Sequence, residues 1–178
     1  MPSLNVLNFV DRATRVHFVC GKIASGKSTL AQQLSRKLNA RLISEDAYLA
    51  QRYPGQIQSI QDYASLTERL KQELEPELLA LLRQGHKLVL DFPANTPKAR
   101  AWLKTLADTA QVKHQMHVLQ VSDSVCKTRL SKRNALGEHP FQPSAGDFDL
   151  FSRYFSLPSF AEGFNTVFYK SSLISNDE

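Results

Sequence analysis

The sequence predicts an α/β domain in which a parallel β-sheet is covered by helices on both faces. Short runs of apolar, strand-forming residues alternate along the chain with segments of helical periodicity. Several runs are apolar at consecutive positions, which is typical of strands buried on both faces. The length of 178 residues, with 42% hydrophobic and 22% charged residues, fits one globular domain over residues 1–178 and excludes a disordered or fibrous chain.

The N-terminal part of the chain begins this alternation. Residues 16–20 form an apolar run that stops at Gly21, and leucines at four-residue spacing then predict a helix over 27–38. A second strand is predicted over 41–44 and a short helix around 47–53.

The middle of the chain contains a long amphipathic segment. Leucines recur every four residues from Leu66 to Leu82, which predicts a helix that ends at Gly85. We expect Pro76 to kink this helix or to start a new one, because proline lacks the amide hydrogen that a helix interior needs. Residues 87–91 predict a third strand, apolar until its last residue.

The remaining elements follow the same pattern. Proline suits the first turn of a helix, and serine is a preferred N-cap, so Pro97 and Ser122 mark two helix starts. Two prolines and two glycines predict a loop over 137–146. The further expected elements are a helix over 97–110, a strand over 115–121, a helix over 123–134, a short helix around 147–154 and a strand over 166–169.

A phosphate-binding motif lies between the first strand and the first helix. Residues 21–28 match G-x-x-x-x-G-K-[ST], the Walker A pattern, in the strand–loop–helix context that this motif requires. Its backbone amides and the helix N-terminus surround a phosphate, the lysine reaches the β- and γ-oxygens, and the hydroxyl ligates Mg²⁺. We therefore assign ATP binding to Gly21, Ala24, Ser25, Gly26, Lys27, Ser28 and Thr29, with Lys27 also catalytic and Ser28 a ligand of Mg²⁺.

Two carboxylates end neighbouring predicted strands. Asp46 follows the second strand and Asp91 ends the third, so both are expected at the sheet edge that carries the phosphate loop. We assign Asp91 to Mg²⁺ and Asp46 to the base that accepts a proton from an attacking hydroxyl. The structural alternatives are an N-cap for Asp46 and a turn residue for Asp91.

Two arginines lie one helical turn apart in the segment 123–134. Arg129 and Arg133 would repel each other on one helix face unless an anion offsets them, and a triphosphate is suited to that role. The alternative is a solvated helix face. The following loop is long enough to move with this helix, so we expect a lid over about 123–146.

These motifs together resemble a known group of proteins. They are similar to bacterial proteins labelled AAA-family ATPases, which belong with small P-loop kinases such as chloramphenicol phosphotransferase, zeta toxins and polynucleotide 5′-hydroxyl kinases. The resemblance covers Val16 to Tyr169 and implies a strand order of 2-3-1-4-5, a catalytic aspartate at Asp46 and lid arginines at Arg129 and Arg133. The similar segments are 21–28, 45–46, 91–95, 129–134 and 158–164.

Three further residues are candidates for the second substrate. Asn95 and Arg100 follow Asp91 closely enough to overhang the same edge, where they could hold an acceptor or only cap and decorate the next helix. Arg52 could bind an acceptor phosphate, as in polynucleotide kinases. Glu162 could pair with a lid arginine, contact the nucleotide or be a surface charge.

The function expected from these residues is ATP-dependent phosphoryl transfer to a hydroxyl of a small molecule, a nucleotide or a nucleic-acid end. An ATP-binding regulatory module is a second hypothesis. A nucleic-acid processing factor is a third, because eight of the 22 Lys and Arg residues lie in 98–133 and the formal net charge is +5. We do not favour nucleic acid as the partner.

The sequence also indicates a compartment. Cys20 and Cys126 are too few for a disulfide framework, and both lie in apolar segments. The N-terminus lacks a leader pattern, and no run approaches the ~18 apolar residues of a membrane span. We therefore expect a cytoplasmic protein without a membrane partner.

Overall fold

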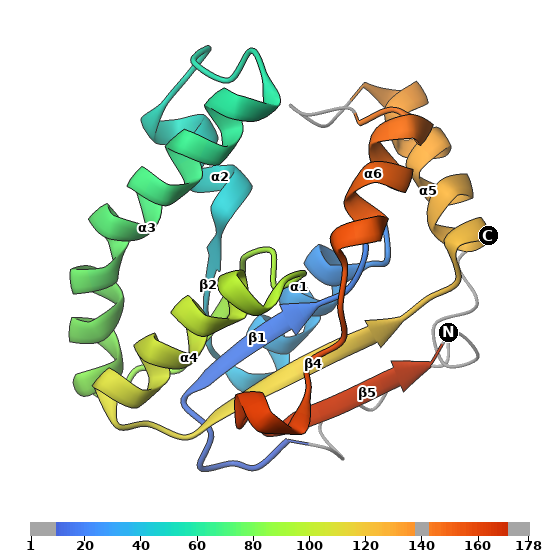
Figure 1. Ribbon diagram of the computed structural model, residues 1–178. Coiled ribbons are helices and arrows are strands. Elements are labelled where there is room, and N and C mark those ends of the chain that lie inside the picture. Colours follow the sequence, from blue (N-terminus) through green and yellow to red (C-terminus); the bar gives the residue numbers. More distant parts are fainter. Residues whose placement is uncertain (1–9, 138–142, 171–178) are drawn as a thin grey trace.

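The computed structural model contains a five-stranded parallel sheet between two layers of helices (Figure 1). It describes residues 10–137 and 143–170. The strands lie side by side in the order β2-β3-β1-β4-β5, which confirms the expected fold class and strand order. Their bounds are β1 (Val16–Cys20), β2 (Arg41–Ser44), β3 (Leu88–Asp91), β4 (His114–Gln120) and β5 (Thr166–Lys170).

The two faces of the sheet are covered by different helices. One buried apolar cluster joins β1, β3 and β4 to α2 (Glu45–Arg52), α3 (Ile60–Arg83) and α4 (Pro97–Ala110). A second cluster joins the opposite face to α1 (Lys27–Leu38), α5 (Asp123–Leu136) and α6 (Ala145–Tyr154). Because both faces of the sheet are buried by apolar side chains, the strands do not alternate between apolar and polar residues. A short 3₁₀ helix (Phe160–Glu162) precedes β5.

The predicted cap residues act at several helix ends. The Ser122 side chain accepts a hydrogen bond from the Val125 amide at the start of α5, and Pro97 lies in the first turn of α4. The expectation that α6 begins near residue 147 was two residues late. Its N-cap is Ser144, which forms a reciprocal capping box with Asp147.

The long helix differs from its prediction. α3 starts at Ile60, before the first leucine of the pattern, and continues through Pro76 to Arg83, so of the two outcomes expected at Pro76, a kink or a new helix, the new helix is excluded. Pro76 is exposed, while Leu74 and Leu78 on either side are fully buried. Packing of this apolar face stabilises the helix although Pro76 has no amide hydrogen to donate. None of the described helices is long and apolar enough to cross a membrane.

Candidate functional site

The phosphate loop lies between β1 and α1 at the carboxyl edge of the sheet. Gly26 has φ +100° and Ala24 has φ +56°, and these two residues with left-handed backbone angles curve the loop into a ring. The Lys27 ammonium lies at the centre of this ring and donates to the carbonyl oxygens of Gly21 and Lys22, at 2.8 and 2.7 Å. The backbone therefore forms the cradle that the sequence motif predicts.

Close packing explains the first glycine of the loop. A Cβ atom on Gly21 would lie 2.5 Å from Ser25 Oγ and 3.2 Å from Leu119 Cβ. Ser25 itself is fully buried, and its hydroxyl has no hydrogen-bond partner among the described residues. Any larger residue at position 21 would force the Ser25 hydroxyl to move and would press on Leu119.

A carboxylate and a hydroxyl meet beside the lysine. Burial raises the pKa of Asp91, and a hydrogen bond from the Ser28 side chain and the charge of Lys27 oppose that rise. Burial lowers the pKa of Lys27, and the charges of Asp91 and Asp46 oppose that change. Ser28 and Asp91 together present hard oxygen donors, the type of ligand that Mg²⁺ prefers, so the residues present fit this ion.

Asp46 lies in the first turn of α2, directly beyond β2. The N-cap of this helix is Ser44, whose side chain accepts from the Ala47 amide, so the alternative that Asp46 is the N-cap was wrong. Ser44 is the register partner of Asp91 on β3. The two carboxylates are thus carried on adjacent strand ends, as expected from the sequence.

The arginine pair of α5 lies on the other side of the phosphate loop. Arg129 Nη1 donates to the Ser25 carbonyl oxygen at 3.4 Å. Arg133 is close enough to Asp46 for their charges to interact: burial lowers the pKa of Arg133, and Asp46 raises it. Lys22 also ties the loop to α5 through an ion pair with Asp123 at 2.5 Å. Residues 138–142 of the expected lid lie outside the described residues.

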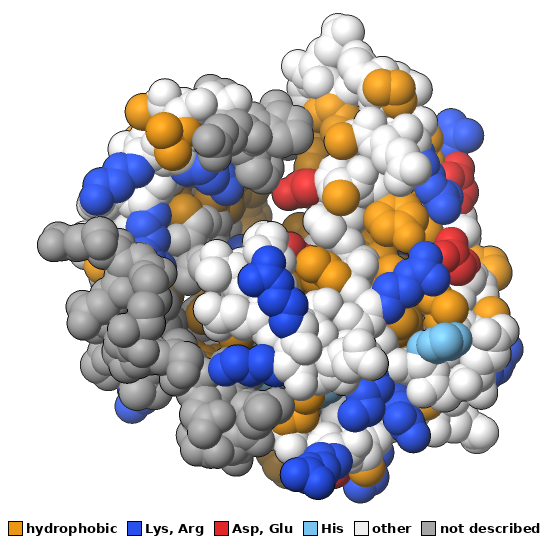
Figure 2. Space-filling model, turned by 180° about the vertical axis from the view of Figure 1, so that it is seen from behind, with side chains coloured by type: hydrophobic (Ala, Val, Ile, Leu, Met, Phe, Trp, Pro, Cys, Tyr) orange, Lys and Arg blue, Asp and Glu red, His pale blue; other side chains and the backbone are white. Residues whose placement is uncertain are grey.

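These groups face each other across a cleft. In Figure 1, α2 and α3 stand on one side of the strand ends, and α5 and α6 stand on the other. The space-filling view in Figure 2 shows the molecule hollowed between these two sides, with acidic side chains at the hollow. The described residues therefore place carboxylates on the α2 side and guanidinium groups on the α5 side.

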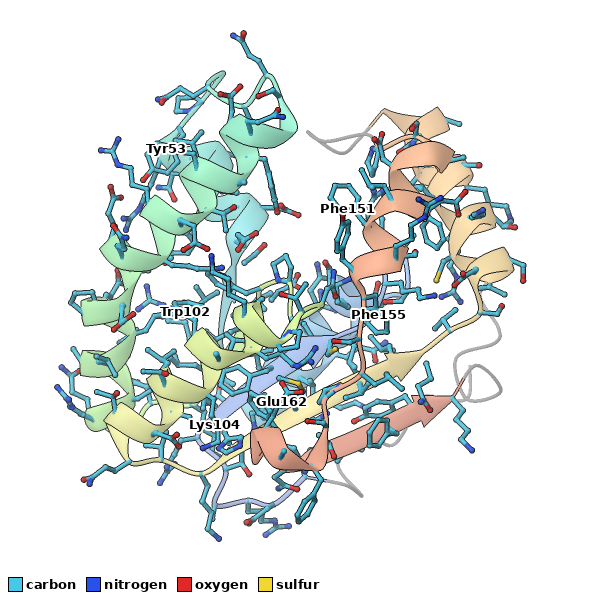
Figure 3. All side chains as sticks on the ribbon, viewed as in Figure 1. Tyr53, Trp102, Lys104, Phe151, Phe155 and Glu162 are labelled. Atoms are coloured by element: carbon cyan, nitrogen blue, oxygen red, sulfur yellow. The ribbon has the colours of Figure 1, made fainter. Side chains whose placement is uncertain are left out.

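Arg100 does not serve the cleft, contrary to expectation. Its side chain is 0% exposed and forms an ion pair with Glu162, at 2.6 and 2.9 Å for its two hydrogen bonds. It also donates to the carbonyl oxygens of Ala94 and Ser156. Figure 3 shows Glu162 beside α4, on the side of the molecule away from Phe151 of α6. Arg100 is therefore a buried structural residue, and Glu162 pairs with it rather than with a lid arginine.

Arg52 is also engaged elsewhere. It donates to Glu73 at 3.1 Å and lies 3.9 Å from Glu77, so its guanidinium ties α2 to α3. Asn95 differs, because its Oδ1 is buried without a hydrogen-bond partner among the described residues. Its backbone carbonyl accepts from the Ser156 amide, which holds the residue in place.

One buried acidic residue at the site was not predicted. Glu45 is 1% exposed, and the Tyr63 hydroxyl donates to its Oε1 at 2.7 Å. Burial raises the pKa of Glu45 to about 7, with the Tyr63 hydrogen bond and Lys71 opposing the rise, and Asp46 and Asp91 adding to it. Its position beside Asp46 is the one signal in the sequence that could have identified it. The spacing along the chain does not indicate its partner Tyr63 on α3.

The basic segment 98–133 does not form one surface. Lys104 pairs with Asp108, Lys113 with Asp11, and Lys127 with Asp149. Arg100 is buried, and Arg129 faces the phosphate loop. Five of the eight basic residues thus make contacts within the molecule, which weakens the observation that favoured a nucleic-acid processing factor.

A family model described as an AAA domain matches residues 16–158, most of the chain. The chain belongs to the AAA domain family. A search of curated protein sequences gave no match for this AAA domain. Its fold is shared with solved structures of kinases, at sequence identities of 20% and below.

Three of these structures show the extent of the similarity. A Chloroflexus aurantiacus protein named as a candidate kinase has a TM-score of 0.72 and 20% identity, with 89% of each chain covered. A sugar kinase from Janibacter has a TM-score of 0.63 and 17% identity over 92% of this chain and 87% of that one. The APS kinase of Mycobacterium tuberculosis, in complex with AMPPNP and APS, has a TM-score of 0.62 and 17% identity, with 89% of each chain covered. The AAA domain therefore has the P-loop kinase fold.

Proposed function

We propose that this AAA domain is a kinase that transfers the γ-phosphoryl group of ATP to a hydroxyl group of an acceptor. The observation that supports the proposal is that Asp46 on α2 and Arg133 on α5, helices on opposite sides of the strand ends, are close enough for their charges to interact. A nucleotide-binding module needs only the cradle. Phosphoryl transfer also needs a base on the acceptor side and positive charge near the transferred group, and the cleft offers both.

The nucleotide side of the site is formed by the loop and α5. The amides of 21–28 and the start of α1 would hold the phosphates, with Lys27 directed at the β- and γ-oxygens. Ser28 and Asp91 would hold Mg²⁺, which supplies neutralisation of the phosphate charge when bound. Arg129 and Arg133 would stabilise the charge that spreads over the transferred phosphoryl group, a role in which one arginine contributes about 10³–10⁵ in rate.

The acceptor side is formed by Asp46 and Asn95. Asp46 would accept the proton of the attacking hydroxyl and orient its oxygen toward the γ-phosphorus. Asn95 offers a buried amide oxygen that could accept a hydrogen bond from the acceptor. We infer that α5 acts as a lid on a single domain, because it contributes both arginines and is tied to the loop through Lys22.

The test is phosphoryl transfer from labelled ATP with Mg²⁺ to a panel of sugars, nucleosides, amino sugars and 5′-hydroxyl oligonucleotides. Asp46→Asn should reduce transfer at least 100-fold, because general base catalysis typically contributes ~10²–10⁴, and should leave ATP affinity within threefold. Asp108→Asn, at the far end of α4, is the control for loss of one negative charge. Full transfer by Asp46→Asn would exclude Asp46 as the base. An absence of transfer to every acceptor by a protein that binds ATP would favour a regulatory module.

A further inference from the structure

One side chain of the phosphate loop reaches both ends of the arm formed by α5 and α6. The Lys22 ammonium pairs with Asp123, the first residue of α5, at 2.5 Å. It also lies 5.8 Å from the ring centroid of Phe155, the C-cap of α6, within the range of a cation–π contact. Figure 3 labels Phe155 where the chain leaves α6. Lys22 therefore lies where the arm begins and where it ends.

The main chain of Lys22 is part of the cradle. Its carbonyl oxygen accepts hydrogen bonds from Lys27 Nζ, at 2.7 Å, and from the Ser25 amide, at 3.2 Å. Through this one residue, the loop that would hold the phosphates is joined to the helices on the α5 side of the cleft.

The position of α5 depends on such polar contacts because its apolar anchor is small. Two of its 14 residues are buried, whereas α4, which is also 14 residues long, buries five. A helix with little buried apolar surface is weakly oriented by packing. In the described part of the chain, two polar contacts join α5 to the phosphate loop: Asp123 with Lys22, and Arg129 with the Ser25 carbonyl.

The foot of α6 is fixed independently of Lys22. The Ser156 amide donates to the Asn95 carbonyl at 3.0 Å, and Arg100 donates to the Ser156 carbonyl at 2.7 Å. Phe155, the preceding residue, is therefore held against the body of the domain. The Lys22 ammonium lies between this fixed ring and Asp123, so its ion pair determines where α5 begins.

We propose that Lys22 is a positioning residue that sets the start of α5 on the phosphate loop, and thereby places Arg129 and Arg133 relative to the phosphates. The inference rests on the proposed kinase function and adds a residue that acts through these arginines. Arg133 lies ten residues beyond Asp123, roughly 15 Å along the helix, so a small tilt at the first turn moves its guanidinium further. A misplacement of about 1 Å can cost ~10² in rate.

The experiment removes each member of the ion pair. Lys22→Gln and Asp123→Asn should each lower the turnover number about tenfold, and the double variant should be no slower than either, because both substitutions remove the same contact. A direct effect of charge on the triphosphate predicts opposite changes, since one substitution removes a positive charge and the other a negative one. Lys22→Arg, which keeps the charge, should retain most of the turnover.

Two further variants separate positioning from a general structural effect. Lys127→Gln breaks the pair between α5 and Asp149 of α6, which does not involve the loop, and should change turnover less than threefold. In an Arg133→Ala background, Lys22→Gln should cause less than a threefold further loss. The Lys22 pair is partly exposed and contributes little to the free energy of unfolding, so the variants should fold.

Hydrogen exchange of the α5 amides, in the complex with AMPPNP and Mg²⁺, tests the contact without an acceptor. Exchange should be at least threefold faster in Lys22→Gln and in Asp123→Asn, and Lys22→Arg should restore it. Wild-type turnover in Lys22→Gln, opposite effects of the two substitutions, or an undiminished loss in the Arg133→Ala background would each overturn the positioning role.

The two proposals can fail separately. A wild-type protein that binds AMPPNP and transfers label to no acceptor would reject the kinase. Faster α5 exchange in both variants would then still support the placement of α5 by Lys22, and wild-type exchange in both would overturn it.

Discussion

Arg100 and Glu162 form an ion pair that joins α4 to the 3₁₀ helix before β5. Two hydrogen bonds run between the guanidinium and the carboxylate, and the Arg100 side chain has no exposed surface. The pair lowers the pKa of Glu162. Because Arg100 also donates to Ala94 and Ser156, it connects the segment after β3 with the segment after α6. Both segments lie next to the phosphate-binding edge.

Removal of the acidic partner should destabilise the fold. Glu162→Gln leaves the buried guanidinium without its counter-charge, which typically costs about 3–5 kcal/mol in the free energy of unfolding. Urea denaturation measures this change. Asp108→Asn breaks the exposed pair with Lys104 and should cost less than about 1 kcal/mol. Equal stability of the two variants would show that the Arg100 pair is not a structural tie.

Alanine at position 21 should impair nucleotide binding, because its Cβ would overlap Ser25 Oγ and force this buried residue of the phosphate loop to move. We expect at least a tenfold loss of ATP affinity by calorimetry. Gly146→Ala is the matched control, since position 146 lies in α6 and a Cβ there would have its nearest neighbour, Ser144 Oγ, at 3.6 Å. That variant should keep wild-type affinity. Unchanged affinity in Gly21→Ala would mean that the loop tolerates a side chain there.

Arg133→Ala should reduce the turnover number about 10³-fold with a smaller effect on ATP binding, because the arginine acts on charge that develops during transfer. Lys132→Ala removes an equal charge from the neighbouring, exposed position of the same helix. Steady-state kinetics with a saturating acceptor distinguish the two. A similar loss in both variants would indicate a general effect of α5 charge rather than a role specific to Arg133.

Acid should destabilise the protein through two buried histidines. His17 Nδ1 lies 3.0 Å from His117 Nε2, and burial lowers their pKa values to about 4 and about 3, with Lys87 and His17 respectively adding to the shift. In the unfolded chain, both histidines become protonated below the ordinary histidine pKa of about 6.5. In the folded protein, they become protonated only near the lowered pKa values. Stability is therefore complete above about pH 6.5 and falls by about 2 kcal/mol per histidine at pH 5.

The measurement is the free energy of unfolding at several pH values for wild type and for His117→Asn. The free energy of unfolding of the variant should decrease less steeply between pH 6.5 and 5, because about one proton fewer is taken up on unfolding. His86→Asn, at an exposed position, is the control and should follow the wild-type slope. A wild-type slope in His117→Asn would mean that other groups govern the acid sensitivity.

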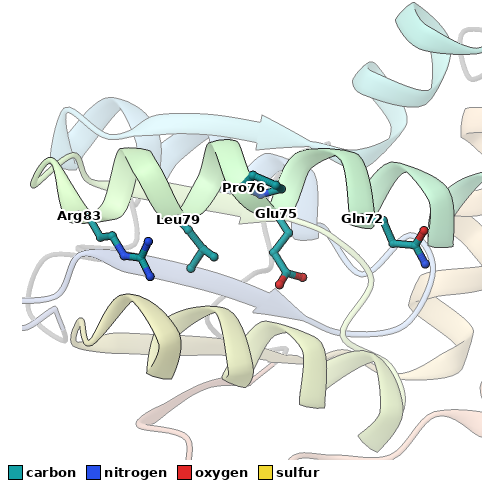
Figure 4. A pocket seen from close by; sticks show the side chains of 5 residues that line it. All are labelled: Gln72, Glu75, Pro76, Leu79 and Arg83. Atoms are coloured by element: carbon teal, nitrogen blue, oxygen red, sulfur yellow. The ribbon is translucent and has the colours of Figure 1, made fainter.

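Local signals predicted much of the fold and where the candidate nucleotide-binding residues lie in it. The Walker A residues, the strand-end carboxylates and the arginines of α5 are each set by short-range pattern, and the structure brings them to one edge. Pro76 shows where local signals fail: the helix in Figure 4 runs through it because the leucines around it are buried. Packing against the sheet outweighs the propensity of a single residue.

The sequence alone determined the phosphate loop and the alternation of strands and helices, because both depend on neighbours within a few residues. Only the tertiary structure decided which charged residues are paired with one another inside the fold. Arg52 and Arg100 pair with carboxylates 21 and 62 residues away. The Tyr63 hydroxyl of α3 donates to Glu45 of α2. Ion pairs between distant segments follow from how the chain packs, and spacing along the sequence does not encode them.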